Sequence, residues 1–145
     1  MGICDTVLTR NFSQHPFVPS DEAARAHICD EILTIQAMGL KKRLSHTNAK
    51  SAVVGISGGL DSTLALLVTA KAFDMLGRDK KEIIAVTMPC FGTTDRTYNN
   101  ACEMTRQTGA TLIEVPIGEA VNVHFRDIGH DPDVHDVTYE NAQAR

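Results

Sequence analysis

The sequence predicts an α/β fold, a doubly wound parallel sheet with helices on both faces. Three short apolar runs are each followed by a segment with helical spacing, which is the strand–helix alternation of such a sheet. With 145 residues, of which 43% are hydrophobic, the chain has room for one domain with a real core. A glycine-rich turn follows the first apolar run, at the end of a strand where parallel sheets bind their ligands.

The N-terminal part is expected to divide after residue 19. Residues 1–19 have few periodic apolar positions and are expected to form a connector, with extended backbone over His15–Pro19. Residues 20–145 are expected to form the folded domain, and Ser20 is the expected N-cap of its first, long helix. The apolar stripe of that helix is wide enough to be packed. It contains Ile28, Ile32 and Ile35 on one face and Leu33, Ala37, Leu40 and Leu44 on the next.

Three strands and their helices are expected in the rest of the chain. The first apolar run is of the kind that forms a fully buried parallel strand, and glycines mark the expected ends of helices. The expected strands are Ala52–Ile56, Ile83–Met88 and Thr111–Val115, and the expected helices end at Gly77, cover 97–108 and cover 118–125. A last helix starts at Tyr139 and has only seven residues, so the domain is expected to be incomplete at its C-terminus.

Charge and composition exclude several function classes. The net charge is −4 and no long basic run is present, so a nucleic-acid-coating protein is not expected. No apolar run approaches 18 residues and no signal peptide is recognisable, so no membrane contact and a cytoplasmic location are expected. The spacing of the four cysteines, Cys4, Cys29, Cys90 and Cys102, does not suit a zinc site.

The Ser57–Ser62 turn, Ser-Gly-Gly-Leu-Asp-Ser, carries the strongest chemical signal. Glycines allow positive φ and close approach of a ligand, and the backbone amides at a helix N-terminus attract phosphate. Ser57 and Ser62 offer hydroxyl donors, whereas Asp61 would repel phosphate unless it holds a bridging Mg²⁺. The alternatives are an ordinary tight turn and a carboxylate that only favours the helix dipole.

This turn differs from the two commonest nucleotide loops. No lysine follows the glycines, as the Walker loop requires, and the spacing of a dinucleotide fold is absent. Its pattern resembles the pyrophosphate-binding loop (PP-loop) of the ATP pyrophosphatase superfamily, which implies an adenine nucleotide alpha-hydrolase-like fold. Members of that superfamily cleave ATP between the α and β phosphates and leave an adenylate on the substrate.

Three further segments resemble NAD synthetases. Asp136–Arg145 is similar to their Glu-Asn-x-Gln-Ala-Arg stretch, and Thr87–Pro89 with Gly92–Thr94 is similar to the loop after their second strand. The segment from Pro16 to Leu44 looks like the connector and first helix of the glutamine-dependent type. The resemblance implies a ligase that amidates deamido-NAD to NAD through an acyl-adenylate and releases AMP and pyrophosphate. Ammonia or glutamine would be its nitrogen source.

The resemblance also implies site residues and partners. ATP and Mg²⁺ are the expected cofactors, Asp61 is the expected metal ligand, and no catalytic side chain is assigned. Asn141 and Arg145 match positions that contact deamido-NAD. An upstream glutaminase domain and a homo-oligomer are the expected partners. The expected ATP-binding residues are Gly55, Ile56, Ser57, Gly58, Gly59, Leu60, Asp61, Ser62 and Met88.

Other functions stay open at this point. The chain could be another PP-loop enzyme, such as an amidotransferase or a tRNA-modifying ligase, or an adenine-nucleotide-binding module without catalysis. It could also be an inactive fragment, since further site residues of the family are expected beyond Arg145. Three histidines lie among aspartates in a segment without ligand spacing, and they are expected to be solvated loop residues: His124, His130 and His135.

Overall fold

The computed structural model describes residues 9–144, and the α/β class with a parallel sheet is confirmed. Residues 1–33 and 34–145 form separate compact units, which are described one at a time. The expected boundary after residue 19 stays a prediction. The elements in chain order are α1 (Glu22–Thr47), β1 (Ala52–Gly55), α2 (Leu60–Leu76), the 3-10 turn η1 (Lys80–Glu82), β2 (Ile83–Thr87), α3 (Asp95–Thr108), β3 (Thr111–Glu114), α4 (Gly118–Ile128) and α5 (Val137–Ala144).

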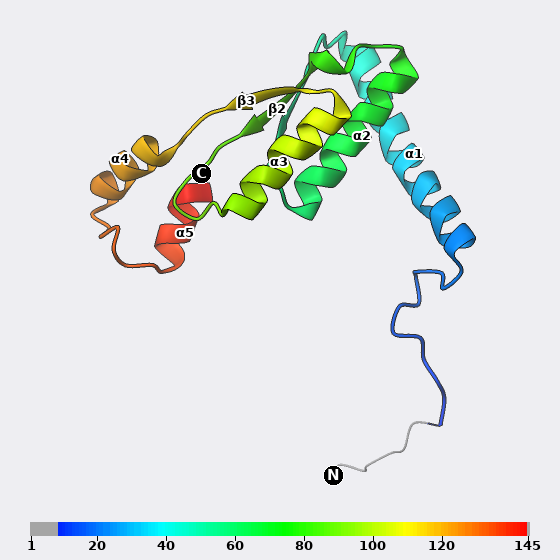
Figure 1. The fold of residues 1–145 in the computed structure, drawn as a ribbon, viewed down its shortest axis with the longest axis horizontal. Helices are drawn as coiled ribbons and strands as arrows, with labels where there is room; N and C mark the ends of the chain where they lie inside the picture. The colour runs from blue at the N-terminus through cyan, green and yellow to red at the C-terminus, as the bar shows by residue number, and fades with distance from the viewer. Residues whose placement is uncertain (1–8, 145) are drawn as a thin grey trace. The chain divides into compact units, whose positions relative to one another are not determined.

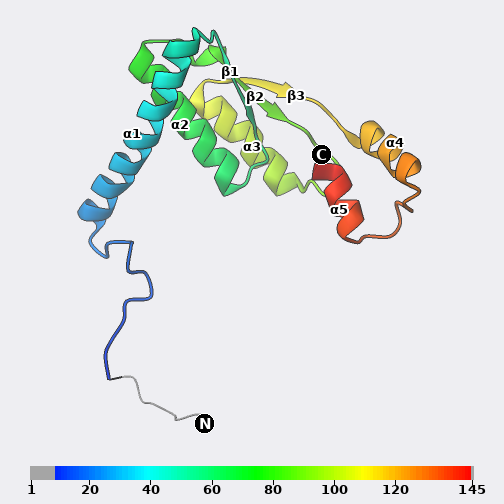
Figure 2. The ribbon, with the colours of Figure 1, turned by 180° about the vertical axis from the view of Figure 1, so that it is seen from behind.

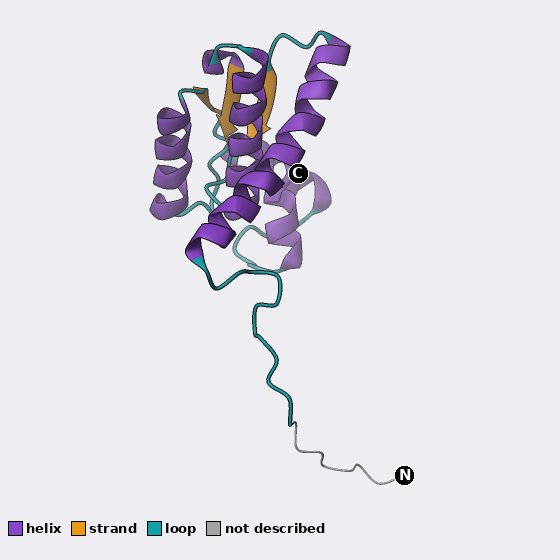
Figure 3. Cartoon of the chain, turned by 90° about the vertical axis from the view of Figure 1, so that its right-hand side faces the viewer, coloured by secondary structure: helices purple, strands orange, loops and turns teal. Residues whose placement is uncertain are grey.

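In the first unit, a loop leads into α1 (Figure 3). The Val18 amide donates to the His15 carbonyl at 3.1 Å, so this segment is a turn and the prediction of extended backbone is wrong. The N-cap also differs from the prediction. The Asp21 carboxylate accepts a hydrogen bond from the Ala24 amide at 2.7 Å, because a side-chain oxygen at the cap reaches the third residue of the helix.

In the second unit, the three strands form a parallel sheet in the order β1-β2-β3. Ala52 pairs with Ile83, and Ile84 pairs with Thr111. Helix α2 packs on β1 and β2, and α3 packs on β2 and β3, so the two helices lie side by side along the sheet (Figures 1 and 2). The largest fully buried side chains of this core are Leu66, Phe73, Ile83 and Thr105.

The sheet is less buried than its apolar sequence predicts. In β2, Ile83 and Ala85 are fully buried, whereas Val53 of β1 is 68% exposed and β3 is exposed along its length. Right-handed crossovers between neighbouring strands place α2 and α3 on the same face of the sheet. An apolar run shows that a strand can be covered on both faces, and it does not show that both covers are present in this chain.

The second unit also contains the C-terminal half of α1. Ala37 and Leu44 are buried in the core there, and Leu40 packs against it, as predicted. Ile35 is 66% exposed, so the prediction that the whole wide stripe is packed is wrong. None of the helices between residues 9 and 144 is long and apolar enough to cross a membrane.

Two helices end where glycines predict, at Gly77 after α2 and at Gly109 after α3. Helix α4 runs to Ile128, three residues beyond its predicted end at Phe125, which shortens the polar loop. The ring of Phe125 lies 5.3 Å from the ring of His130, whose side chain is only 12% exposed. His130 therefore packs against α4, and the prediction that it is a solvated loop residue is wrong.

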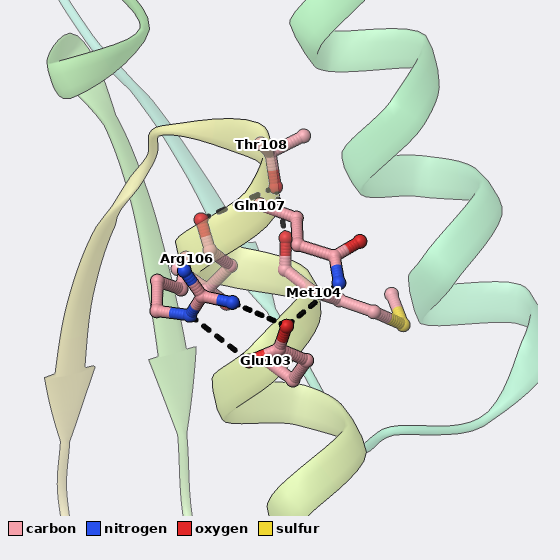
Figure 4. Close-up of polar contacts among 6 residues, drawn as sticks. Glu103, Met104, Arg106, Gln107 and Thr108 are labelled. Atoms are coloured by element: carbon pink, nitrogen blue, oxygen red, sulfur yellow. Dashed lines mark hydrogen bonds and ion pairs between the residues drawn. The ribbon is translucent and has the colours of Figure 1, made fainter.

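The exposed side of α3 carries a local polar network (Figure 4). Glu103 accepts hydrogen bonds from Arg106 Nε at 2.9 Å and from Gln107 Nε2 at 2.7 Å. The hydrogen bonds from Arg106 and Gln107 hold the pKa of the Glu103 carboxyl below its ordinary value. One turn later, the Thr108 hydroxyl donates to the Met104 carbonyl. These contacts join residues three and four positions apart, which are neighbours on a helix surface.

Candidate nucleotide-binding site

The Ser57–Ser62 turn lies at the carboxyl end of the sheet. Ile56 is buried, and its amide donates to the Val86 carbonyl at 2.8 Å, which continues the pairing of β1 with β2 by one residue. Ser57 then turns away from the sheet, and α2 begins at Leu60. The turn therefore occupies the edge at which open parallel sheets bind ligands.

The two serine hydroxyls hold the turn together. Ser62 Oγ accepts a hydrogen bond from the Ser57 amide at 3.2 Å and donates to the Gly59 carbonyl at 3.1 Å. Ser57 Oγ lies 3.1 Å from Ser62 Oγ and accepts from the Gly59 amide at 3.3 Å. The sequence predicted that these hydroxyls serve a phosphate. In the structure they already bond to each other, which fixes the shape of the backbone.

The free donors of the turn are backbone amides. The first bond of α2 runs from the Thr63 amide to the Gly59 carbonyl at 3.1 Å, and Gly59 provides no side-chain cap. The amides of Leu60, Asp61 and Ser62 precede that bond and make no hydrogen bond to residues 9–144. Three unpaired N–H groups at the positive end of the helix dipole suit an anion.

Gly58 and Gly59 differ in backbone conformation and in the space around them. Gly58 has φ of 80°, and a β-carbon there would overlap the carbonyl of Thr97 at the start of α3. Gly59 has φ of −88°, and a β-carbon there would only touch Ser57 Oγ at 3.4 Å. The predicted positive φ is confirmed for Gly58 and wrong for Gly59. The missing β-carbon of Gly58 makes room for α3.

A cleft of about 490 Å³, called here the loop cleft, opens beside the turn. One wall is the end of β1 with the turn, and the other is the end of β2 with the start of α3. Sequence reasoning found Met88 but missed the α3 wall, which the rule about carboxyl ends of strands could have pointed to. The lining residues are Gly55, Ile56, Ser57, Gly59, Thr87, Met88, Gly92, Thr93, Thr97 and Tyr98.

A second cleft of about 540 Å³, called here the α4–α5 cleft, lies on the other side of Met88. Met88 is 49% exposed and lines both clefts. Asn141 lines neither; it borders a smaller hollow of about 120 Å³ beside His124. Arg145 lies outside the described residues. The α4–α5 cleft is lined by Met88, Ile117, Ala120, Val121, His124, Ala142, Gln143 and Ala144.

Asp61 is exposed in the first turn of α2, next to the unpaired amides. No three His, Cys, Asp or Glu side chains in residues 9–144 gather as an all-protein metal site would require. A single carboxylate beside unpaired helix-start amides still fits Mg²⁺, which commonly takes one or two carboxylates and completes its shell with phosphate oxygens and water.

Tyr98 forms part of the α3 wall and is tied to β3. Its hydroxyl donates a hydrogen bond to Glu114 Oε2 at 2.5 Å. That hydrogen bond, together with the neighbouring Cys102, raises the pKa of Tyr98 from 10.0 to about 12. The contact joins the start of α3 to the carboxyl end of β3 and so fixes the wall of the loop cleft.

Known proteins are similar to this chain in sequence. The glutamine-dependent NAD(+) synthetase of Mycobacterium leprae is 42% identical over an alignment of 141 residues, which covers 94% of this chain and 21% of that protein. The NH(3)-dependent enzyme of Picrophilus torridus is 32% identical over 99 residues, which are 68% of this chain and 36% of that protein. The chain thus spans about a fifth of the first relative and about a third of the second.

A solved structure has the same fold. The glutamine-dependent NAD+ synthetase from Acinetobacter baumannii, in complex with adenosine diphosphate, matches with a TM-score of 0.69 and 27% identity. The match covers 79% of this chain and 21% of that one. Residues 32–145 also match the sequence model of the family described as NAD synthase, and that segment contains both clefts and the turn. The chain therefore belongs to the NAD synthase family.

Proposed function

We propose that this chain forms the nucleotide-binding part of an enzyme that amidates deamido-NAD to NAD at the expense of ATP. The observation that supports this most directly is the row of unpaired amides, Leu60 to Ser62, beside the loop cleft. Membership of the NAD synthase family supports the choice of reaction. The Acinetobacter baumannii relative, solved with adenosine diphosphate, supports an adenine nucleotide as the ligand.

In this proposal, the turn holds the pyrophosphate end of ATP. The amides of α2 donate to phosphate oxygens, and the mutual bond of Ser57 and Ser62 keeps those amides in place before the ligand arrives. Asp61 would hold Mg²⁺, which neutralises the phosphate charge when bound. Met88, between the two clefts, would contact the adenosine portion.

The chemistry requires positioning more than acid–base catalysis. A nicotinate carboxylate is a poor electrophile, so its oxygen first attacks the α-phosphorus of ATP and pyrophosphate leaves. Ammonia then attacks the acyl-adenylate carbon, and AMP leaves with the bonding electron pair. The protein accelerates such steps by aligning reactants and stabilising developing charge.

The remaining assignments belong to the same proposal. Asn141 and Arg145 would contact deamido-NAD from α5 and the residue after it. A glutaminase domain would precede the chain and release ammonia from glutamine. The relatives named glutamine-dependent, of which the chain covers 21%, support that arrangement. A homo-oligomer is proposed as well.

Binding and turnover test the proposal separately. The 145-residue chain should bind α,β-methylene ATP in a Mg²⁺-dependent manner, and the Asp61→Asn variant should lose the Mg²⁺ dependence. For turnover, the chain would replace the segment of the Mycobacterium leprae relative that it matches, 21% of that protein. This hybrid should form NAD and AMP from deamido-NAD, ATP and ammonium, and Asp61→Asn should abolish both products. Binding by the chain and a folded, inactive hybrid would favour a nucleotide-binding module without catalysis.

A further inference from the structure

The side chain of Gln143 connects α5 to the loop after β2. Its Oε1 atom accepts a hydrogen bond from the Gly92 amide at 3.0 Å, across 51 positions of sequence. Its Nε2 atom donates to the Tyr139 carbonyl one turn earlier in α5 at 3.2 Å. Both ends of the amide are therefore used, and α5 lies beside the loop in both views (Figures 1 and 2).

The two partners of this hydrogen bond border different clefts. Gly92 lines the loop cleft, and Gln143 lines the α4–α5 cleft. Apart from Met88, which belongs to both, no lining residue is shared. The bond between Gly92 and Gln143 is thus a polar connection between the walls of two neighbouring clefts.

Two hydrogen bonds hold together the loop that contains Gly92. The Thr93 amide donates to the Cys90 carbonyl at 2.9 Å, and the Cys90 amide donates to Thr93 Oγ1 at 2.9 Å. The next residue, Thr94, caps α3, whose first turn carries the other cleft-lining residues, Thr97 and Tyr98. Gly92 is therefore connected through Thr93 and Thr94 to the α3 wall of the loop cleft. The start of the same loop also contacts α4 and α5: the Ile117 amide donates to the Pro89 carbonyl at 3.2 Å, and Cys90 packs against the cluster of Val121, Phe125 and Ala142.

We propose that Gln143 is a positioning residue that couples the two clefts. When a ligand occupies the α4–α5 cleft, Gln143 shifts or stiffens, and through Gly92 this changes the affinity of the loop cleft for nucleotide. The effect is reciprocal, because coupling between two binding sites acts equally in both directions. The inference rests on the proposed function, which gives ATP·Mg²⁺ to the loop cleft. Deamido-NAD is assigned to the α4–α5 cleft because α5, the helix proposed to contact that dinucleotide, forms one of its walls.

Two variants separate the hydrogen bond from the side-chain volume. Gln143→Met keeps the length of the side chain and loses both hydrogen bonds. Gln143→Glu keeps an oxygen that accepts from the Gly92 amide, but it loses the donor to the Tyr139 carbonyl and adds a negative charge. Its diagnostic readout is therefore the hydrogen exchange of the Gly92 amide. Gln107→Met is the matched control, because Gln107 also bonds through its amide, to Glu103, but on the exposed side of α3 (Figure 4).

The experiment measures the affinity of each chain for α,β-methylene ATP with Mg²⁺, with and without deamido-NAD, and the hydrogen exchange of the Gly92 amide. Gln143→Met should weaken nucleotide binding by about three- to tenfold, the range of one lost hydrogen bond. It should also speed Gly92 exchange and remove the influence of deamido-NAD. Gln107→Met should behave like the wild type, and Gln143→Glu should keep the slow exchange of the Gly92 amide.

Two results would overturn the inference without touching the proposed function. One is a Gln143→Met chain with wild-type affinity and wild-type Gly92 exchange. The other is a Gln143→Glu chain whose Gly92 amide exchanges as fast as in Gln143→Met, because an acceptor at position 143 would then not hold the loop. A wild-type chain that binds no nucleotide would instead overturn the proposed function, and the coupling with it.

Discussion

The backbone of Gly58 lies directly against the carbonyl group of Thr97, with no room for a β-carbon between them. The first residue belongs to the turn before α2, and the second to the first turn of α3. The two walls of the loop cleft are therefore in atomic contact at its base. At that point, their spacing is set by packing of backbone against backbone.

A side chain at position 58 should therefore lower the free energy of unfolding of the chain. Gly58→Ala would force a β-carbon into the Thr97 carbonyl and would hold alanine at φ of 80°. We expect a loss of roughly 2–5 kcal/mol in the free energy of unfolding, from the left-handed backbone and the overpacking together. Urea denaturation followed by circular dichroism would measure it. Gly59→Ala is the control, with an expected change within about 1 kcal/mol, and equal losses in the two variants would contradict this account.

Asp61→Asn should separate metal dependence from folding. Asp61 is exposed, so the variant should unfold at the same urea concentration as the wild type. Its affinity for α,β-methylene ATP in Mg²⁺ should fall at least about tenfold, to the value measured with EDTA, because phosphate charge is no longer neutralised by a held cation. Isothermal calorimetry at matched ionic strength would show this, with Asp127→Asn on α4 as the charge control. An undiminished affinity would remove Asp61 from the site.

Tyr98 should ionise late and make stability fall at high pH. Its hydrogen bond to Glu114 raises the pKa of the phenol from 10.0 to about 12. The neutral phenol is favoured in the folded state, so the contribution to stability is complete below pH 10 and is lost as the pH rises from 10 to about 12. The difference in ultraviolet absorbance between wild type and Tyr98→Phe, followed against pH, would give this titration directly.

Glu114→Gln provides the matched control for that titration. It keeps an acceptor for the Tyr98 hydroxyl and removes the negative charge beside it. The pKa of Tyr98 should return toward its ordinary value, because a neutral amide opposes the phenolate less than a carboxylate does. A late titration that persists in Glu114→Gln would assign the shift to another neighbour.

Ser62→Ala should loosen the turn without unfolding the chain. The substitution removes the acceptor of the Ser57 amide and the donor to the Gly59 carbonyl. Because the turn is exposed, water replaces these partners, and we expect a stability loss of only about 1 kcal/mol. Nucleotide affinity should fall more than stability suggests, since the amides lose their fixed direction. Calorimetric titration would measure it beside Ser51→Ala, and a change equal to that control would contradict the prediction.

The sequence predicted the position of the Ser57–Ser62 turn better than the residues that surround it. The order of strands and helices, the glycine stops and the turn after β1 follow from local spacing, and the structure has them where the sequence predicts. The α3 wall was not predicted, because Thr97 and Tyr98 are spaced like ordinary residues of an amphipathic helix. Thr97 and Tyr98 come to line the cleft because Gly58, 39 residues before Thr97, has no β-carbon and lets α3 approach the turn. Burial was misjudged for Val53 and Ile35 for a similar reason, since periodicity reports which side is apolar and not what covers it.

Under the proposed function, the mutual bond of Ser57 and Ser62 leaves the phosphate to backbone amides. Every residue except proline presents the same N–H, so a substitution of Leu60 would leave the donors of the turn in place. The preference for one phosphorylated compound over another would then come from the shape of the two clefts. Selection for a new substrate would act on α3, α4 and α5 before it acted on the amides of the turn.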